Sequence, residues 1–503
     1  MTAATLPRSL PRTPGLRVPA GLRLLRIELR RSPMPWILPV VAGLFWFDSY
    51  RPSASQPPFW TLRTFWNMGQ GHTIIDFGPL VAGMAAWIGS RDARRGMADL
   101  VTALAAPAWT RRTAAWAAAA AWAVGAYLVF VAVLFGVYAA QGLHGQPPWW
   151  WAGVGATGVA AFSAAGFAVG ALVRGRYAAP LATIGSLIAL MFSSQTGFSD
   201  ASGWALILPT NSNGNYQAPS GIFYPYLPDL PIARMLFLAG LTVAIVGLLG
   251  LTGAAGGPRI GMIAAVVTAC GVAASGTAVG LATTARLAAD GMVIAALHDA
   301  ASDRPIAYTP ACARASGVPV CVNPAYRSYL PDLTAAVAPE LKALAGLPGA
   351  PVRAVQTAGA YQRREGGAGQ DVAITGTPPV LSIPLDAEGL PGSFGWTSQE
   401  LTDDLRLLTI HAFITGGDTA GTPAQQAVQS ALLEQAGVPF SQQTRGLDGF
   451  GLSWWVRTVQ TRTPAISAAA RRLAGLPAAA RTAWFTTRLP ALRASTLTLA
   501  DLP

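Results

Sequence analysis

Long apolar stretches separated by short basic segments dominate the first 284 residues of the chain. A helix that crosses a bilayer needs about 20 apolar residues, and seven stretches approach that length. They are Met34–Phe47, Ile74–Ser90, Thr113–Ala140, Trp149–Val173, Tyr177–Ser193, Ile232–Thr252 and Ile260–Thr284. The first is short, because Pro35 and Pro39 interrupt it. The pattern predicts an α-helical polytopic membrane domain over residues 33–284, with about seven transmembrane helices.

Residues 285–503 alternate between short apolar and polar segments and contain no further span. Helical periodicity is present in four segments, Ala325–Ala345, Ser398–Ile414, Pro423–Gln435 and Ile466–Leu473. Pro351–Thr357 and Asp371–Pro384 have strand character, and the segment after Pro477 indicates one or two helices and a short tail. This half is therefore predicted to be a mixed α/β domain that is mostly helical.

Charge separates the same two halves. Of the whole chain, 52% is hydrophobic and only 12% is charged, against about a quarter in soluble domains. The first 284 residues carry 18 Arg against 7 acidic residues, whereas the remainder is nearly balanced. The excess of arginine over acidic residues lies in loops beside the spans. It therefore indicates membrane topology, and no nucleic-acid partner is expected.

Arginine placement predicts the orientation of the spans. Seven Arg precede the first span, and the basic segments then fall in alternate loops, which is the pattern of cytoplasmic loops. The N-terminus is therefore expected in the cytoplasm, and seven crossings place residues 285–503 outside the membrane. The outer loop Ser194–Pro231 is long, and it is either a structured element near an outer gate or a plain connection.

Three cysteines bear on this topology. Cys270 lies in an apolar run, while Cys312 and Cys321 are close in the external half. A disulfide persists outside the cytoplasm, so the topology favours a Cys312–Cys321 bridge over two unrelated buried thiols.

Two cytoplasmic segments have amphipathic character. Residues 1–32 form the N-terminal segment, in which Pro19–Arg31 is predicted to be a helix lying in the inner interface rather than a simple basic anchor. Between the second and third spans, Arg91 to Arg112 begins with charged residues and continues into an apolar patch before Pro107. A short helix over about 91–107 would present that patch to a soluble partner.

This second segment resembles the coupling-helix region of ABC-2 type permeases, the membrane subunits of bacterial ABC exporters. The matching positions are Arg94, Arg95, Gly96, Leu100, Leu104, Ala106, Pro107 and Arg111, with Asp92 at the acidic position and Asp99 within the segment. Met97 departs from the family, which usually has Thr after the glycine. Together with the interfacial helix before the first span, the resemblance covers about residues 15–255.

The resemblance implies a dimeric export path, built from two copies or from a sister permease, in a bacterial inner or plasma membrane and driven by a separate ATPase. The only lysine, Lys342, does not lie in a phosphate-binding G-x-x-x-x-G-K-[ST] loop, so no ATPase, enzyme activity or cofactor is expected in this chain. Asp48, Asp76 and Arg234 are expected near span ends, where charge costs little; the lack of other charge favours a hydrophobic or amphipathic cargo. Membrane lipid is a further expected partner.

Two alternatives remain for the external half. It is a receptor or sensor held by the spans, or an inactive peptidase-like domain. Some permeases of this kind are fused to aminopeptidase-like zinc domains, which need H-E-x-x-H. The corresponding positions here are His411, Ala412 and Thr415, so two of the three required groups are missing and no metal site is expected. An unrelated binding domain with one structural histidine explains the same residues.

Overall fold

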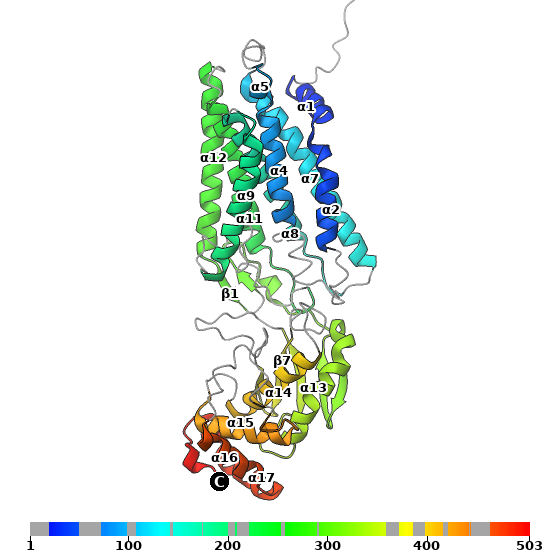
Figure 1. The fold of residues 1–503 in the computed structure, drawn as a ribbon, viewed down its shortest axis with the longest axis vertical. Helices are drawn as coiled ribbons and strands as arrows, with labels where there is room; N and C mark the ends of the chain where they lie inside the picture. Colours follow the sequence, from blue (N-terminus) through cyan, green and yellow to red (C-terminus); the bar gives the residue numbers. More distant parts are fainter. Residues whose placement is uncertain are drawn as a thin grey trace, which may run out of the picture.

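The chain folds into a bundle of long helices with a mixed helix-and-sheet region at one end of it (Figure 1). In the computed structural model, the described residues are 20–49, 72–97, 107–140, 144–173, 175–199, 207–208, 221–252, 257–288, 291–358, 372–385, 398–415, 421–441, 443 and 463–503. The helices of the first part are α1 (Ala20–Arg31), η1 (Met34–Trp36), α2 (Leu38–Ser49), α4 (His72–Gly89), α5 (Arg91–Arg94), α7 (Ala108–Ala140), α8 (Trp149–Leu172), α9 (Ala178–Ser199), α11 (Asp229–Leu251) and α12 (Gly257–Thr283).

Four helices within the described residues are long and apolar enough to cross a membrane by themselves. They are Ala108–Val137 of α7, α8, α11 and Pro258–Thr283 of α12. The predicted total of seven is not confirmed by this criterion. The first predicted span becomes η1 and the 12-residue α2, which is about 18 Å long against a bilayer core of about 30 Å. In α4 and α9 the apolar parts are the shorter segments Phe77–Gly89 and Ala178–Ser193.

Small residues bring the bundle helices into backbone contact. On α8, a methyl group added at Gly166 would lie 2.6 Å from the Ala82 carbonyl carbon of α4, and one at Gly170 would lie 2.7 Å from that of Ala86. On α11, Gly240 would meet the Ser275 nitrogen of α12 at 2.7 Å. Such close packing is how helices associate in lipid, where apolar surface alone gives no driving force.

The C-terminal region contains both short strands and helices, and the elements after β7 are all helical. Its strands are β1 (Arg286–Ala288), β2 (Gly291–Val293), β3 (Ala311–Ala315), β4 (Val318–Val322), β5 (Arg353–Thr357), β6 (Ala373–Thr375) and β7 (Val380–Pro384). Its helices are η5 (Ala300–Asp303), η6 (Pro324–Tyr329), α13 (Leu330–Leu344), α14 (Ser398–Thr415), α15 (Pro423–Gln435), α16 (Pro464–Ala474), α17 (Ala478–Arg493) and η8 (Leu499–Asp501). The mixed α/β character predicted from the sequence is present, and the predicted helices occur at α13 to α17.

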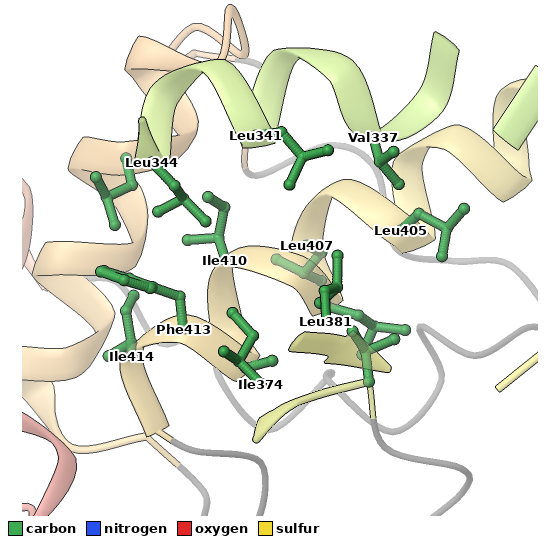
Figure 2. Close-up of a cluster of buried hydrophobic side chains, with 14 of the residues drawn as sticks. Val337, Leu341, Leu344, Ile374, Leu381, Leu405, Leu407, Ile410, Phe413 and Ile414 are labelled. Atoms are coloured by element: carbon green, nitrogen blue, oxygen red, sulfur yellow. The ribbon is translucent and has the colours of Figure 1, made fainter. Parts of the chain in front are cut away.

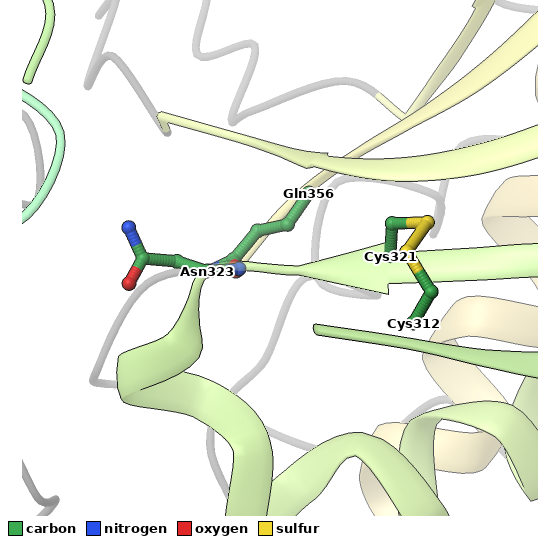
Figure 3. Close-up of a disulfide and its surroundings, with 4 residues drawn as sticks. All are labelled: Cys312, Cys321, Asn323 and Gln356. Atoms are coloured by element: carbon green, nitrogen blue, oxygen red, sulfur yellow. A yellow bond between two sulfur atoms is a disulfide. The ribbon is translucent and has the colours of Figure 1, made fainter. Parts of the chain in front are cut away.

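A five-stranded mixed sheet, in the order β3-β4-β5-β7-β6, organises this region. The β3–β4 hairpin was not predicted, because the alanines of β3 have little strand propensity and Pro319 interrupts the valines of β4. Ser316 and Gly317 close it with φ values of 49° and 88°, which the two-residue turns of tight hairpins require. Cys312 and Cys321 are directly opposite in this register, and a disulfide joins them as predicted (Figure 3).

The core of the C-terminal region lies between the sheet and helices α13 and α14. Figure 2 shows Leu341 and Leu344 of α13 facing Ile410 of α14, with Leu381 of β7 next to Leu407 of α14. Their side chains are at most 8% exposed. Burying an apolar side chain of this size stabilises a fold by roughly 1.5–3 kcal/mol, so this cluster is sufficient to hold the helices on the sheet.

The segment just before α11 belongs to the same core. Ile222 and Phe223 are 5% exposed and pack with the buried side chains of the C-terminal region. The Asn323 side-chain amide donates to the Ile222 carbonyl at 3.3 Å, and the Ile306 amide donates to that of Phe223 at 2.7 Å. The described end of the predicted outer loop is therefore structured, and it joins the bundle to the C-terminal region.

Candidate functional site

The end of the bundle opposite the C-terminal region carries exposed arginines on α1 and around α5 (Figure 1). On α1, Arg23, Arg26 and Arg30 are exposed, beside the exposed apolar residues Leu22 and Ile27. The helix predicted over Pro19–Arg31 is thus present as α1, with both charged and apolar side chains open to its surroundings. Such a surface suits a membrane interface, where arginine heads reach water or phosphate and leucines reach acyl chains.

A bidentate ion pair joins α1 to α5. The Arg91 guanidinium donates to Glu28 Oε2 at 3.1 Å and to Oε1 at 3.0 Å, and Arg91 Nε lies 3.6 Å from Asp92 Oδ1. The hydrogen bond from Arg91 to Glu28 raises the pKa of Arg91, more than its partial burial lowers it. Both side chains are less than one-third exposed, and a two-point arginine–carboxylate contact fixes orientation as well as distance. The two elements are 63 residues apart in the chain and are held as one unit.

Arg94 is fixed against the end of α4. Its guanidinium carbon lies 3.3 Å from the centroid of the Trp87 ring, and its nitrogens donate to the Trp87 carbonyl at 2.7 Å and to Ser90 Oγ at 3.1 Å. Partial burial and the neighbouring charge of Arg95 lower the pKa of Arg94. A cation stacked on tryptophan is stabilised by the ring quadrupole. The start of the predicted coupling segment is therefore locked to α4, while Arg95 stays exposed.

Helix α5 ends after four residues because Gly96 adopts a left-handed conformation. Its φ is +64°, and the Gly96 amide donates to the Ala93 carbonyl while the Met97 amide donates to that of Asp92. These bonds form a glycine C-terminal cap. A helix that runs continuously over 91–107, as the sequence suggested, is therefore interrupted here. Of the predicted residues, Asp92, Arg94, Arg95 and Gly96 lie together around α5. Pro107 precedes α7, and Asp99, Leu100 and Leu104 lie outside the described residues.

The return of this segment to the bundle is anchored on α11. Trp109 Nε1 donates to the Val246 carbonyl at 3.0 Å, and Arg112 donates to the Leu249 carbonyl at 3.3 Å. On the other side of α7, Trp122 Nε1 donates to the Leu29 carbonyl of α1 at 2.9 Å. We call α1, α5 and these anchoring contacts the basic platform. A displacement of the platform would therefore act directly on α4, α7 and α11.

Sequence reasoning missed the residues that assemble the platform. Glu28, Trp109 and Trp122 act through contacts between distant segments, whereas Trp87 contacts Arg94 seven residues later. One signal was available: Glu28 is the only acidic residue in α1, whose other charged residues are arginines. A single carboxylate on a basic helix indicates a specific cationic partner.

Arg234 corrects a second expectation. It lies within α11, and its side chain is fully buried, with the guanidinium carbon 5.2 Å from the centroid of the Trp151 ring of α8. Arg234 is the sixth residue of α11 and thus lies near a span end as predicted, but the expectation that its charge costs little there is wrong, since the side chain is enclosed by protein. The side chains of Asp48 and Asp76 lie outside the described set.

The C-terminal region offers little for zinc chemistry in its described part. His411 lies on α14, Ala412 is fully buried, and Thr415 Oγ1 donates to the His411 carbonyl at 2.9 Å. Burial lowers the pKa of His411 and favours its neutral form. Among the described residues, no group of three His, Cys, Asp or Glu side chains is placed to hold a metal ion.

Comparisons with protein families, curated proteins and solved structures found no match to the chain.

Proposed function

We propose that this chain is the transmembrane permease subunit of an ATP-driven ABC exporter, with its ATPase supplied by a separate subunit. The observation that carries the proposal is the basic platform. Its helix α5 follows α4 and is joined to the amphipathic α1 by the Glu28–Arg91 ion pair. The chain re-enters the bundle at α7, where Trp109 and Arg112 donate to carbonyls of α11. A rigid, exposed element with direct contacts to several bundle helices is what an ATPase needs in order to shift the bundle between two states.

The proposed topology has seven crossings, the N-terminus in the cytoplasm of a bacterium and the C-terminal region outside the inner or plasma membrane. In Figure 1, α1 and β1 lie at opposite ends of the bundle. An odd number of crossings explains this arrangement, whereas four crossings would not. On this proposal α2, α4 and α9 complete the set, with α2 extended by neighbouring residues. The Cys312–Cys321 disulfide supports an external, oxidising location for the C-terminal region.

The proposed cargo is hydrophobic or amphipathic. The described spans are almost free of exposed charge, and Arg234 is enclosed between helices. Ionisable groups that line a path are the mark of ion or proton transport, and the buried Arg234 beside Trp151 does not form such a series. The exposed apolar residues of α12, among them Met262, Val266 and Val272, would face lipid or a second permease subunit.

A membrane-anchored receptor or sensor is the second candidate. The observation that favours it is the direct attachment of the C-terminal region to the start of α11, through the Asn323 contact to Ile222 and the Ile306 contact to Phe223. A ligand that moved the C-terminal region would move α11 through these contacts. A sensor of this kind has no need of an ATPase-docking platform, so the two candidates differ at the opposite end of the bundle.

Co-purification separates the two functions. The chain is expressed with the ATPase encoded beside it and purified through a tag on the permease. The test variant replaces both Leu100 and Leu104 with Asp, which puts two carboxylates into the apolar patch of the coupling segment. The matched control is Val352→Asp, an apolar residue that is 51% exposed in the C-terminal region.

The exporter proposal predicts that the ATPase co-purifies with the unaltered chain and with the Val352 variant but not with the Leu100/Leu104 variant. Failure of every ATPase to bind the unaltered chain would remove the source of energy and leave the sensor as the better account.

A further inference from the structure

Three titratable side chains bridge the start of α11 and the C-terminal region. Asp229 is the first residue of α11 and is fully buried. Its Oδ2 accepts a hydrogen bond from the Ile294 amide at 2.9 Å and lies 3.1 Å from His298 Nδ1. The other ring nitrogen of His298 lies 2.7 Å from Asp303 Oδ1 on η5. One imidazole ring therefore stands between two carboxyl groups from opposite sides of the junction.

This geometry requires a specific protonation state. An ionised carboxylate only accepts hydrogen bonds, so two carboxylates on the two ring nitrogens need two N–H donors. Only the imidazolium form of His298 has both, because a neutral imidazole carries one proton. Asp229 also accepts a hydrogen bond from the Ile294 amide and lies in the first turn of α11, at the positive end of the helix dipole.

The two carboxylates differ in what they lose when the imidazolium is neutralised. The Asp303 side chain is 53% exposed and can be hydrated in place of its histidine partner. Asp229 is fully buried, and its Oδ1 has no hydrogen-bond partner within the described part of the chain. A buried carboxylate that loses its counter-charge is costly unless water enters. Opening of the contact between residues 294–303 and α11 is the response that admits water.

The pKa of His298 has the direction that this arrangement requires. Partial burial lowers it, but the hydrogen bond to Asp303 and the charges of Asp229 and Asp303 raise it by more, so the net displacement is upward. A group whose pKa is raised by folding stabilises the folded contact fully below its ordinary pKa, about 6.5, and loses that contribution as the pH rises through the raised value. Asp229 from α11 and Asp303 from η5 are the charged groups acting on the ring; neighbouring Asp299 instead accepts from the Ala301 amide.

Other contacts at this junction do not involve titratable groups. The Phe223 carbonyl accepts from the Ile306 amide, and the Ile222 carbonyl accepts from the Asn323 side chain. They keep the C-terminal region attached at any pH, while the histidine contact reaches the helix itself. Since α11 packs along α8 and α12, a change at its first residue acts on the centre of the bundle.

We propose that Asp229, His298 and Asp303 form a proton-dependent latch, which holds the C-terminal region against the first turn of α11 when His298 is protonated and loosens when it is not. The latch would let the pH at this face of the membrane set how tightly the C-terminal region controls α11. It does not rest on the exporter proposal, because a sensor would use it equally.

Amide hydrogen exchange of the full chain in nanodiscs tests the latch. Exchange of peptides covering residues 291–299 is followed from pH 5.5 to 8.5 and corrected for intrinsic exchange with a reference peptide from α13, residues 330–344. We expect a several-fold loss of protection in 291–299 as the pH rises above about 6.5, with no comparable loss in the reference. Protection of 291–299 that stays constant over this range would overturn the proposal.

Three variants make the test specific. His298→Gln removes the titration and should abolish the pH dependence. Asp303→Asn removes one charge at a half-exposed position, so the fold is kept and the midpoint should move to lower pH. His411→Gln is the matched control and should keep the loss of protection in 291–299 above pH 6.5, since His411 lies on α14 and makes no contact with Asp229 or Asp303. A midpoint that Asp303→Asn leaves in place, or a pH dependence that survives His298→Gln, would refute the latch.

Discussion

The contact between α4 and α8 depends on glycines at two positions, and replacing them has an effect of predictable sign. A methyl group at Gly166 would lie 2.6 Å from both the carbonyl carbon and the Cα of Ala82. At Gly170, the corresponding distances to Ala86 would be 2.7 and 2.8 Å. Ordinary carbon–carbon contacts are about 3.5–4.0 Å, so the two helices would have to separate by about 1 Å. We expect Gly166→Ala and Gly170→Ala each to destabilise the bundle.

The magnitude follows from the loss of close packing. A gap of about 0.5–1 Å forfeits a quarter to a half of the dispersion attraction of the atoms that line it. Overpacking of this kind typically costs about 1–3 kcal/mol. The alanine side chain also favours the helix by roughly 0.8–1.0 kcal/mol over glycine, at least in water, so the net loss is smaller than the steric cost alone.

Gly136 provides the control. It is helical, in α7, and an added methyl group there would meet nothing within 4 Å. Thermal unfolding of the purified protein in one detergent is the assay. We expect Gly136→Ala to unfold at the same temperature as the unaltered chain or slightly higher, and both α8 variants to unfold several degrees lower. Equal unfolding temperatures for Gly166→Ala and Gly136→Ala would refute the argument that α4 and α8 meet through these glycines.

Three further predictions concern other parts of the chain. Glu28→Arg and Arg91→Glu should each destabilise the platform by about 1 kcal/mol, and combining the two exchanges should recover most of the loss. A double-mutant cycle of unfolding temperatures measures this, and additive losses would mean that the pair is not formed. Replacing Cys312 and Cys321 with Ser should lower the stability of the C-terminal region by about 2–3 kcal/mol for a sequence separation of 9, seen as a lower denaturant midpoint that reductant no longer changes. Burial lowers the pKa of His411, so the unfolded chain binds the proton more tightly than the folded chain does. The C-terminal region should therefore lose stability as the pH falls below about 6.5. His411→Gln should remove that loss between pH 8 and 5, and a pH dependence of stability that the variant leaves unchanged would contradict this prediction.

Hydrophobic periodicity was sufficient to predict the helical bundle, because lipid-facing helices must be apolar over their whole length. It identified Pro35 and Pro39 as interruptions of the first run, but it did not predict that the run divides into η1 and α2. It also missed the β3–β4 hairpin, in which the alanine-rich β3 is held by pairing with the valines of β4 and by the Ser316–Gly317 turn. The disulfide was predictable because the topology expected from the arginines assigned both cysteines to an oxidising compartment.

The candidate site was predicted only in part, for a physical reason. Local sequence identified the basic segment, but the helix expected over about 91–107 is interrupted at Gly96. The partner of Arg91 lies 63 residues earlier, on a different helix, and the anchors Trp109 and Trp122 contact segments that only the tertiary fold brings near. The Asp229–His298 contact could likewise not be predicted from the sequence, because no spacing rule links the start of a helix with a turn 69 residues later.

Site-specific photo-crosslinking can show whether an ATPase docks on the basic platform. A photoreactive amino acid is placed at Ala93, which is exposed on α5, and in a second version at Ala295, which is exposed at the opposite end of the bundle. Each is irradiated in membranes that contain the neighbouring ATPase. The account predicts a covalent permease–ATPase product from position 93 and none from position 295. No product from position 93, although the same ATPase is present and both versions insert normally, would contradict the docking of an ATPase on this platform.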